Sequence, residues 1–117
     1  MTYYSGFVAA VPTANRQAYT DHAAQSWPMF QKRGAIRMVE CWGEDVPKGE
    51  VTDFYRATAA KDDETPVFSW IEWPDRDTCD KAWADIMADP EMQQMPEMPF
   101  DGARMFWGGF TPIVDKS

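Results

Sequence analysis

The sequence predicts an α+β domain of ferredoxin-like topology, with strands and helices in the order β-α-β-β-α-β. Segments rich in Val, Ile, Phe, Tyr and Trp indicate four strands, at residues 2–11, 35–42, 67–73 and 103–114. Two helical segments, 13–33 and 75–89, separate the first strand from the second and the third from the fourth. Right-handed crossovers place both helices on one face of a four-stranded antiparallel sheet.

The first helix has recognisable start and stop signals. Thr13 is a candidate N-cap, and Gly34 supplies a left-handed residue just after the expected end. Pro28 is unusual, because it removes one helical hydrogen bond and should kink the last turns. The apolar residues share one face through spacings of three and four; they are Tyr19, Ala23, Trp27 and Phe30.

The second helix begins after Pro74, with Asp75 or Asp77 as its cap, and ends at the Asp89-Pro90 step. Its expected buried stripe consists of Cys79, Ala82, Trp83, Ile86 and Met87. Two connections are less regular. Residues 51–60 read as a short extra strand or hairpin arm, and residues 90–100 as an irregular loop rich in Met and Pro.

Both faces of the predicted sheet are apolar. The third strand carries Val67, Ile71 and Trp73 on one side and Phe68 and Trp70 on the other. Two helices cover only one face, so something else must shield the second. A second copy of the chain, packed sheet to sheet, is the favoured cover, which predicts a homodimer of the dimeric α/β-barrel type. The alternative is a monomer in which residues 43–64 fold over the open face.

Length and composition set further limits. The 117 residues fit one domain, 1–117, and their net charge of −8 argues against nucleic-acid binding. Two cysteines and one histidine do not form a recognisable metal site, so neither a metal nor a cofactor is expected. The short apolar stretch near the N-terminus is too short for a signal peptide or membrane span, and free thiols suit a reducing compartment. These observations predict a cytoplasmic protein.

Candidate functional residues are polar side chains at positions where apolar ones are expected. Glu40 lies on an apolar side of the second strand and could act as a general base or ligand anchor; the alternative is an ion pair with Arg56 or Arg104. The two arginines could bind a substrate carboxylate. Alternatively, Asp101 and Arg104 clasp a turn, and Arg56 pairs with Glu40 or Glu72. His22, the only histidine, is a second catalytic candidate.

The aromatic residues are also ambiguous. One set of them could line a site for a flat ligand, or it could belong to the core and the dimer interface; its members are Trp70, Trp73, Trp83, Trp107, Phe68 and Phe106.

The chain resembles the YbaA-like family of small uncharacterised bacterial proteins. The resemblance is carried mainly by VECWGEDVPKGEVTDF (39–54), KDDETPVFSWIEWP (61–74) and MPFDGARMFWGGF (98–110). This family is similar to the dimeric α/β-barrel proteins, which are paired ferredoxin-like domains, so the resemblance implies the same fold and a dimer. It implies no activity.

Three functions are compatible with these residues. The first is a homodimer that binds a small, partly aromatic or carboxylate-bearing ligand between sheet and helices. The second is a cofactor-independent oxygenase, isomerase or lyase with Glu40 or His22 as base, which rests on fold analogy. The third is a purely structural dimer without a pocket. An open cavity above roughly 300 Å³ favours the first two, and a closed core with an ion-paired Glu40 favours the third.

Overall fold

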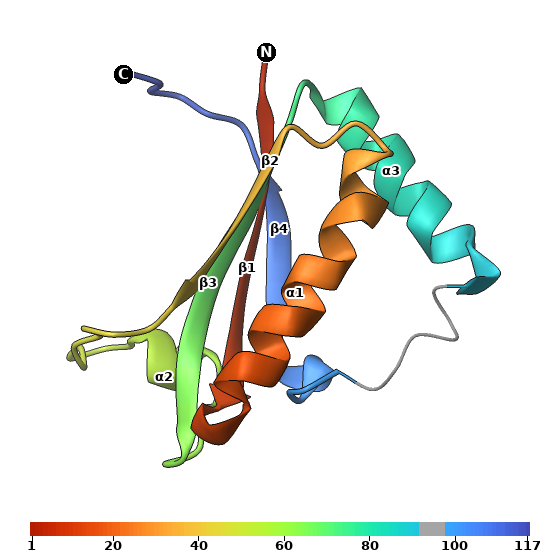
Figure 1. Cartoon of the computed structure of the whole chain (residues 1–117). Helices are drawn as coiled ribbons and strands as arrows, with labels where there is room; N and C mark the ends of the chain where they lie inside the picture. Colours follow the sequence, from red (N-terminus) through yellow and green to blue (C-terminus); the bar gives the residue numbers. More distant parts are fainter. Residues whose placement is uncertain (92–97) are drawn as a thin grey trace.

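The predicted topology is confirmed by the computed structural model, which describes residues 1–91 and 98–117 (Figure 1). The sheet is antiparallel throughout, in the order β2-β3-β1-β4. Its strands are β1 (Tyr3–Pro12), β2 (Arg37–Trp42), β3 (Glu64–Trp73) and β4 (Phe106–Phe110). The central strands β1 and β3 pair along their whole length. The middle of the predicted Met- and Pro-rich loop, 92–97, lies outside the described residues.

The two long helices, α1 (Arg16–Gln31) and α3 (Arg76–Ala88), lie on the same side of the sheet (Figure 1). Asp75 caps α3 by accepting a hydrogen bond from the Thr78 amide at 2.7 Å. Of the two predicted caps, Asp75 and Asp77, the first is therefore the one used. Gly34 has the predicted positive φ, at 102°.

The predicted start of the first helix is wrong. Residues Thr13–Asn15 form a 3₁₀ turn, and α1 begins at Arg16 without a side-chain cap. The cause is the long β1–β3 pairing. It holds the Thr13 hydroxyl against the Thr65 hydroxyl, at 2.7 Å, and directs the Thr13 amide to the Asp63 carbonyl at 2.8 Å. The hydroxyl and amide of Thr13 therefore bond to residues next to and at the start of β3, and neither is free to cap α1.

The predicted extra strand at 51–60 is also wrong, because this segment contains the short helix α2 (Phe54–Ala57). Asp53 caps it by accepting the Arg56 amide at 2.8 Å. The last strand is shorter than predicted as well. Gly102–Arg104 form a 3₁₀ turn capped by Asp101, and β4 ends at Phe110.

The sheet has two different faces. Alternate residues of the strands, such as Val67, Ile71 and Trp73, are buried beneath the helices. The opposite face is apolar too. Its end near α2 is partly covered, where Val46 and Phe54 share a small pocket with Phe68, and the rest carries no helix in the described part of the chain. Three of its phenylalanines are between 44% and 59% exposed, namely Phe68, Phe106 and Phe110. The sequence-based expectation that both faces are apolar is therefore confirmed.

The core beneath the helices is divided into two clusters. The larger surrounds Trp73 and Phe30 and includes the buried residues of α3, Cys79, Ala82 and Ile86. The smaller surrounds Val11, Val67 and Tyr19 at the other end of the sheet. The space between the clusters is not filled by side chains, and this gap is where the candidate site lies.

Candidate functional site

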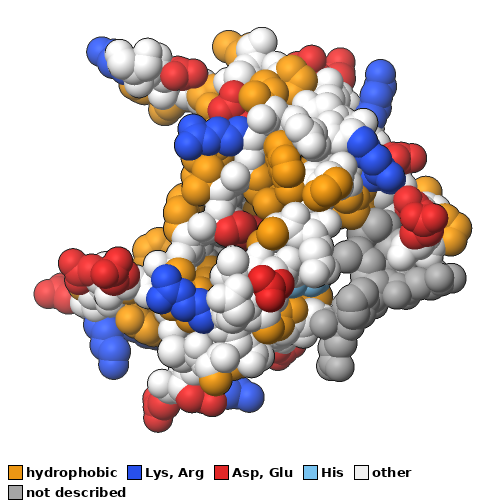
Figure 2. Space-filling view, viewed as in Figure 1, with side chains coloured by type: hydrophobic (Ala, Val, Ile, Leu, Met, Phe, Trp, Pro, Cys, Tyr) orange, Lys and Arg blue, Asp and Glu red, His pale blue; other side chains and the backbone are white. Residues whose placement is uncertain are grey.

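A cavity of about 580 Å³ opens between the sheet and the two long helices. Figure 2 shows hydrophobic side chains gathered in the hollow between these layers. Ligand sites in proteins commonly measure roughly 300–1,000 Å³, so the cavity can hold a small molecule. Its lining is Phe7, Ala9, Tyr19, His22, Ala23, Ser26, Met29, Phe30, Met38, Glu40, Val67, Ser69, Ile71, Trp83, Ile86, Met98, Phe100 and Met105.

The cavity exists because short side chains occupy positions where large ones would fill the space. Ala9 and Ser69 face the helices from the central strands, and Ala23 and Ser26 face the sheet from α1. A well-packed interior leaves few voids larger than a water molecule, so a gap of this size is not ordinary core packing. Larger side chains from Phe100 and Met105 close one end.

Glu40 and Tyr19 form the polar centre of the cavity. Glu40 projects from β2 toward the helices, and the Tyr19 hydroxyl donates a hydrogen bond to its Oε1 at 2.6 Å. Burial raises the pKa of Tyr19 well above its ordinary value, and the negative charge of Glu40 raises it further. Tyr19 therefore stays protonated and remains the donor of this pair.

The surroundings also raise the pKa of Glu40, because the protein around the carboxyl removes water from it. Hydrogen bonds from Tyr19 and Ser69 act in the opposite direction and are weaker. Glu40 nevertheless stays exposed, since β2 is an edge strand and the cavity opens onto it. A smaller groove of about 250 Å³, along β2, also reaches Glu40 and Tyr19. A carboxyl with a raised pKa that remains accessible is suited to accept a proton.

His22 lies in the same cavity wall, three residues after Tyr19 on α1. The structure thus brings the two predicted catalytic candidates, Glu40 and His22, to one cavity, and whether either acts in catalysis stays a prediction. The predicted ion pair of Glu40 with Arg56 or Arg104 is wrong, because Glu40 bonds to Tyr19 and both arginines are engaged elsewhere.

Arg56 closes its own loop and does not line the cavity. Its guanidinium pairs with Asp53, with Nε 3.0 Å from Oδ2, and donates to the backbone carbonyls of Gly49, Glu50 and Val51. The guanidinium N–H groups of Arg56 thus form their hydrogen bonds with residues 49–53, the segment just before α2. The predicted pairing with Glu40 or Glu72 is replaced by this local one.

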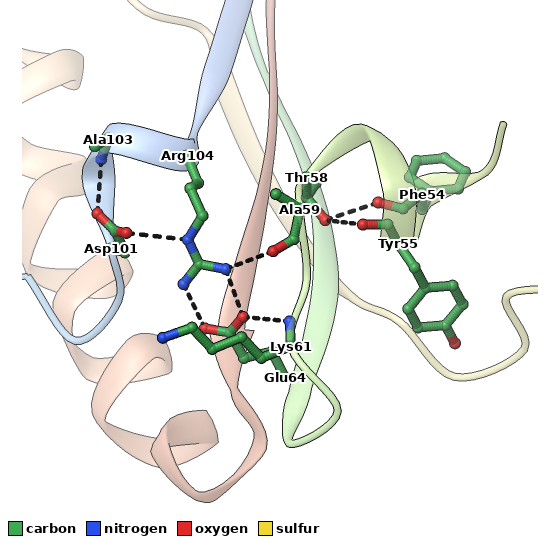
Figure 3. A network of polar contacts seen from close by, with 9 residues as sticks. All are labelled: Phe54, Tyr55, Thr58, Ala59, Lys61, Glu64, Asp101, Ala103 and Arg104. Carbon is green, nitrogen blue, oxygen red and sulfur yellow. Dashed lines mark hydrogen bonds and ion pairs between the residues drawn. The ribbon is translucent and has the colours of Figure 1, made fainter.

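Arg104 lies at the centre of a network that joins three segments of the chain (Figure 3). Its two terminal nitrogens each approach one carboxylate oxygen of Glu64 at 2.6 Å, and its Nε donates to Asp101 at 3.0 Å. A further bond at 2.8 Å reaches the carbonyl of Ala59, a residue with φ of 52°. The predicted clasp between Asp101 and Arg104 is confirmed, and Arg104 does not line the cavity.

The two predicted ligand-binding tryptophans do not line the cavity either. Trp70 lies on the open face of the sheet, edge-on to Tyr4 and beneath the guanidinium of Arg37, 5.4 Å from its ring. Trp107 points to the helix side of the edge strand β4 and is 66% exposed. Of the predicted aromatic set, Trp83 does line the cavity, and the other aromatic walls are Phe7, Phe30 and Phe100.

Sequence reasoning missed Tyr19 and Ser69 as members of the site. The spacing of Tyr19 in the apolar stripe of the helix predicts only a buried position. The available signal was a carboxylate and a tyrosine on elements that pack against each other, since a buried tyrosine hydroxyl usually needs a partner. Ser69 gave no signal in the sequence, because its neighbours in β3 are large apolar residues and a single serine in such a strand is not unusual.

Two other kinds of site are not found in the described residues, 1–91 and 98–117. No three His, Cys, Asp or Glu side chains there gather in a way that could hold a metal ion. None of the helices there is long and apolar enough to cross a bilayer. Both cysteines are free; Cys41 is exposed and Cys79 is buried.

Comparison with known proteins gives relatives for almost the whole chain. It is 50% identical to the uncharacterized protein YbaA of Escherichia coli strain K12, over 99% of this chain and all of that protein. The Shigella flexneri protein of the same name is equally similar. A solved dimeric ferredoxin-like protein from an uncultured marine organism shares the fold, with a TM-score of 0.52, 12% identity, and coverage of 100% of this chain and 99% of that one.

A second solved structure is SnoaB from Streptomyces nogalater, a cofactor-independent oxygenase. It aligns with a TM-score of 0.52 and 18% identity over 97% of this chain and 93% of its own. The two structural likenesses confirm the fold class. Residues 2–102 match the model of a protein family of unknown function, DUF1428, and together with the 50% identity to YbaA this match shows that the chain belongs to the DUF1428 family.

Proposed function

We propose that this protein binds one small, largely apolar ligand in the cavity between the sheet and the two helices. The observation that carries the proposal is the combination of a 580 Å³ cavity with the hydrogen-bonded pair of Glu40 and Tyr19 inside mostly apolar walls. Binding sites for small molecules typically have this composition, in which a few polar groups orient a ligand held by hydrophobic contacts. An open cavity and a Glu40 without an ion pair favour binding over a purely structural role.

Filling the cavity is expected to abolish binding. Ala23 is 7% exposed and lines the cavity, so Ala23→Leu places a larger side chain where the ligand would lie. A ligand at about 100 times its Kd stabilises a protein by about 2.7 kcal/mol, which raises Tm by several degrees. The measurement is a thermal-shift screen of neutral, anionic and cationic aromatic compounds, together with native mass spectrometry for co-purified molecules.

The matched control is Ala84→Leu, which makes the same change at an exposed position of α3. Compounds that stabilise the wild-type chain should still stabilise this control and should fail to stabilise Ala23→Leu. Equal responses of both variants would place the binding site outside the cavity. A screen without a single stabilising compound would contradict the proposal as a whole.

We also propose that the protein is a homodimer joined through the open face of its sheet. Phe68, Phe106 and Phe110 leave an apolar surface on this face, and exposed patches of this kind usually mark an interface. The marine ferredoxin-like protein of the same fold is described as dimeric, which supports the proposal. Two copies placed face to face about a two-fold axis would cover both surfaces at once.

Analytical ultracentrifugation should therefore give twice the chain mass of 13.4 kDa at micromolar concentration. Phe106→Asp places a charge in the proposed interface and is expected to shift the protein to monomers, because a buried unpaired carboxylate is costly. Met87→Asp is the control, since Met87 is 78% exposed on the outer side of α3. A Phe106→Asp protein that keeps the dimeric mass would show that the interface lies elsewhere.

A second candidate function is cofactor-independent catalysis, with Glu40 as general base and His22 as an alternative base. The raised pKa of the accessible Glu40 favours it, and SnoaB shows that a protein of this fold can be a cofactor-independent oxygenase. Glu40→Gln separates the two functions once a ligand is known. In an enzyme it should abolish turnover and largely preserve ligand-induced stabilisation, whereas a binding protein has no turnover to lose.

We further infer a cytoplasmic location without nucleic-acid partners. Two free cysteines suit a reducing compartment, and a net charge of −8 disfavours contact with phosphate backbones.

A further inference from the structure

The charged groups of the cavity restrict what it can bind. Among the described residues that line it, the ionisable side chains are Glu40, Tyr19 and His22, and none is Lys or Arg. The arginines expected to hold a carboxylate are engaged elsewhere, Arg56 by Asp53 and Arg104 by Glu64. We infer that the ligand is an uncharged aromatic alcohol, a phenol or naphthol, whose hydroxyl donates a hydrogen bond to Glu40. This inference rests on the proposed binding function.

The hydrogen-bonding capacity of the polar centre calls for a donor on the ligand. The Tyr19 hydroxyl already donates its proton to Glu40 Oε1, and the Ser26 hydroxyl donates to the carbonyl of Ala23 at 2.6 Å. A carboxylate has about four acceptor positions on its two oxygens. Tyr19 and Ser69 use at most two of those on Glu40, so acceptor capacity remains and a hydroxyl-bearing ligand can satisfy it.

The same centre disfavours acids. A ligand carboxylate placed against Glu40 would set two like charges close together inside apolar walls, where repulsion is stronger than in water. The net charge of −8 adds to this repulsion over a longer range. A cationic amine is attracted by these same negative charges. It is disfavoured because the apolar lining removes water from an ammonium group, and a single carboxyl compensates only part of that cost.

The walls fit a flat ring. Trp83 packs against Phe30 and Phe7, with centroid distances of 5.4 Å and 6.0 Å, along one side of the cavity. Phe100 and Tyr19 form a second aromatic pair at 5.5 Å. Aromatic rings stack favourably on such surfaces in offset or edge-on arrangements. An aromatic body between these walls would bring its hydroxyl toward the Tyr19–Glu40 pair.

Four probes of similar size and different polar group test the inference by calorimetry at pH 7. They are 2-naphthol, 2-methoxynaphthalene, 2-naphthoate and 2-naphthylmethylamine. We expect 2-naphthol to bind at least tenfold more tightly than each of the others. The Glu40→Gln variant lacks the repulsion between Glu40 and the carboxylate of 2-naphthoate. The ratio of the Kd of 2-naphthoate to that of 2-naphthol should therefore fall at least tenfold in this variant. The Ala23→Leu variant should bind none of the four.

The outcomes separate this inference from the proposed function. Binding of 2-naphthoate or the amine as tight as that of 2-naphthol, abolished by Ala23→Leu, would overturn the ligand class and leave the cavity as the binding site. Equal binding of 2-naphthol and 2-methoxynaphthalene would show that no hydroxyl donor is recognised, which also overturns it. Failure of all four probes in the wild-type chain, together with an empty thermal-shift screen, would contradict both proposals.

Discussion

Arg104→Met is expected to lower the free energy of unfolding several times more than the loss of an exposed ion pair does, because it breaks the paired contact with the Glu64 carboxylate. Its guanidinium holds both oxygens of Glu64, whose side chain is only 4% exposed, at 2.6 Å (Figure 3). Removing the arginine leaves a buried carboxylate without its partner. It also frees the Ala59 carbonyl and releases Asp101, so that the turn before β4 loses its connection to the start of β3.

Urea unfolding measures this loss, and Arg76→Met is the matched control. Arg76 pairs with Asp80 at 3.5 Å, with both side chains more than 60% exposed, so its loss should cost less than about 1 kcal/mol. The double variant Arg104→Met with Glu64→Gln should recover part of the stability, because the unpaired charge is removed. An Arg104→Met protein as stable as Arg76→Met would show that the network contributes little.

Acid should weaken the same network. The hydrogen bonds from Arg104 lower the pKa of Glu64 from its ordinary 4.5 to about 2. A carboxyl with a depressed pKa in the folded state stabilises the protein fully above about pH 4.5, and this contribution is lost as pH falls toward 2. Unfolding measured from pH 6 to pH 2 should show this loss in the wild-type chain. The slope should be smaller in Glu64→Gln, and an unchanged slope would assign the acid sensitivity to other carboxyls.

Trp73→Ala is expected to cost about 3–5 kcal/mol, because it empties the centre of the larger core cluster. Trp73 is fully buried, lies edge-on to Phe30 with a centroid distance of 6.4 Å, and donates its indole N–H to Ser5 at 3.0 Å. The alanine variant therefore loses apolar contacts and one buried hydrogen bond, and it leaves a cavity beside α3.

Thermal or urea unfolding of two further variants tests this explanation. Trp73→Phe keeps a ring in the core and should cost roughly half as much. Trp107→Ala removes the same side chain from a position that is 66% exposed, and should cost less than about 1 kcal/mol. Similar losses for Trp73→Ala and Trp107→Ala would show that burial does not explain the effect.

The sequence predicted the topology because local signals agreed with it. The strands are rich in β-branched and aromatic residues, Asp75 caps a helix, and Gly34 ends one. The prediction of an extra strand at 51–60 is wrong because it relied on the strand propensity of Phe54 and Tyr55. The Asp53 side chain instead caps a short helix there. Thr13 was misassigned for a related reason, since long-range strand pairing decided its conformation rather than its capping propensity.

The candidate site was only partly predictable. Glu40 and His22 were identified because polar residues on apolar elements are unusual, and the structure brings both to one cavity. The clasp between Arg104 and Asp101 was predictable because the two residues flank one turn. The pairs of Arg104 with Glu64 and of Arg56 with Asp53 were not, because the first depends on how the turn before β4 packs against β3 and the second on how residues 49–56 fold. The size of the cavity could not be foreseen, because it depends on which short side chains of separate elements, such as Ala9, Ala23 and Ser69, face one another.

The short side chains beneath the helices have a consequence for how selectivity could change in this family. Ala9, Ala23 and Ser69 lie on the central strands and on α1 and face the cavity, so a larger side chain at any of them would extend into open space. One substitution would then shorten or divide the chamber while the fold and its pairing stay intact. Relatives with the same architecture could therefore accept molecules of different size, and these three positions are where such divergence should be sought.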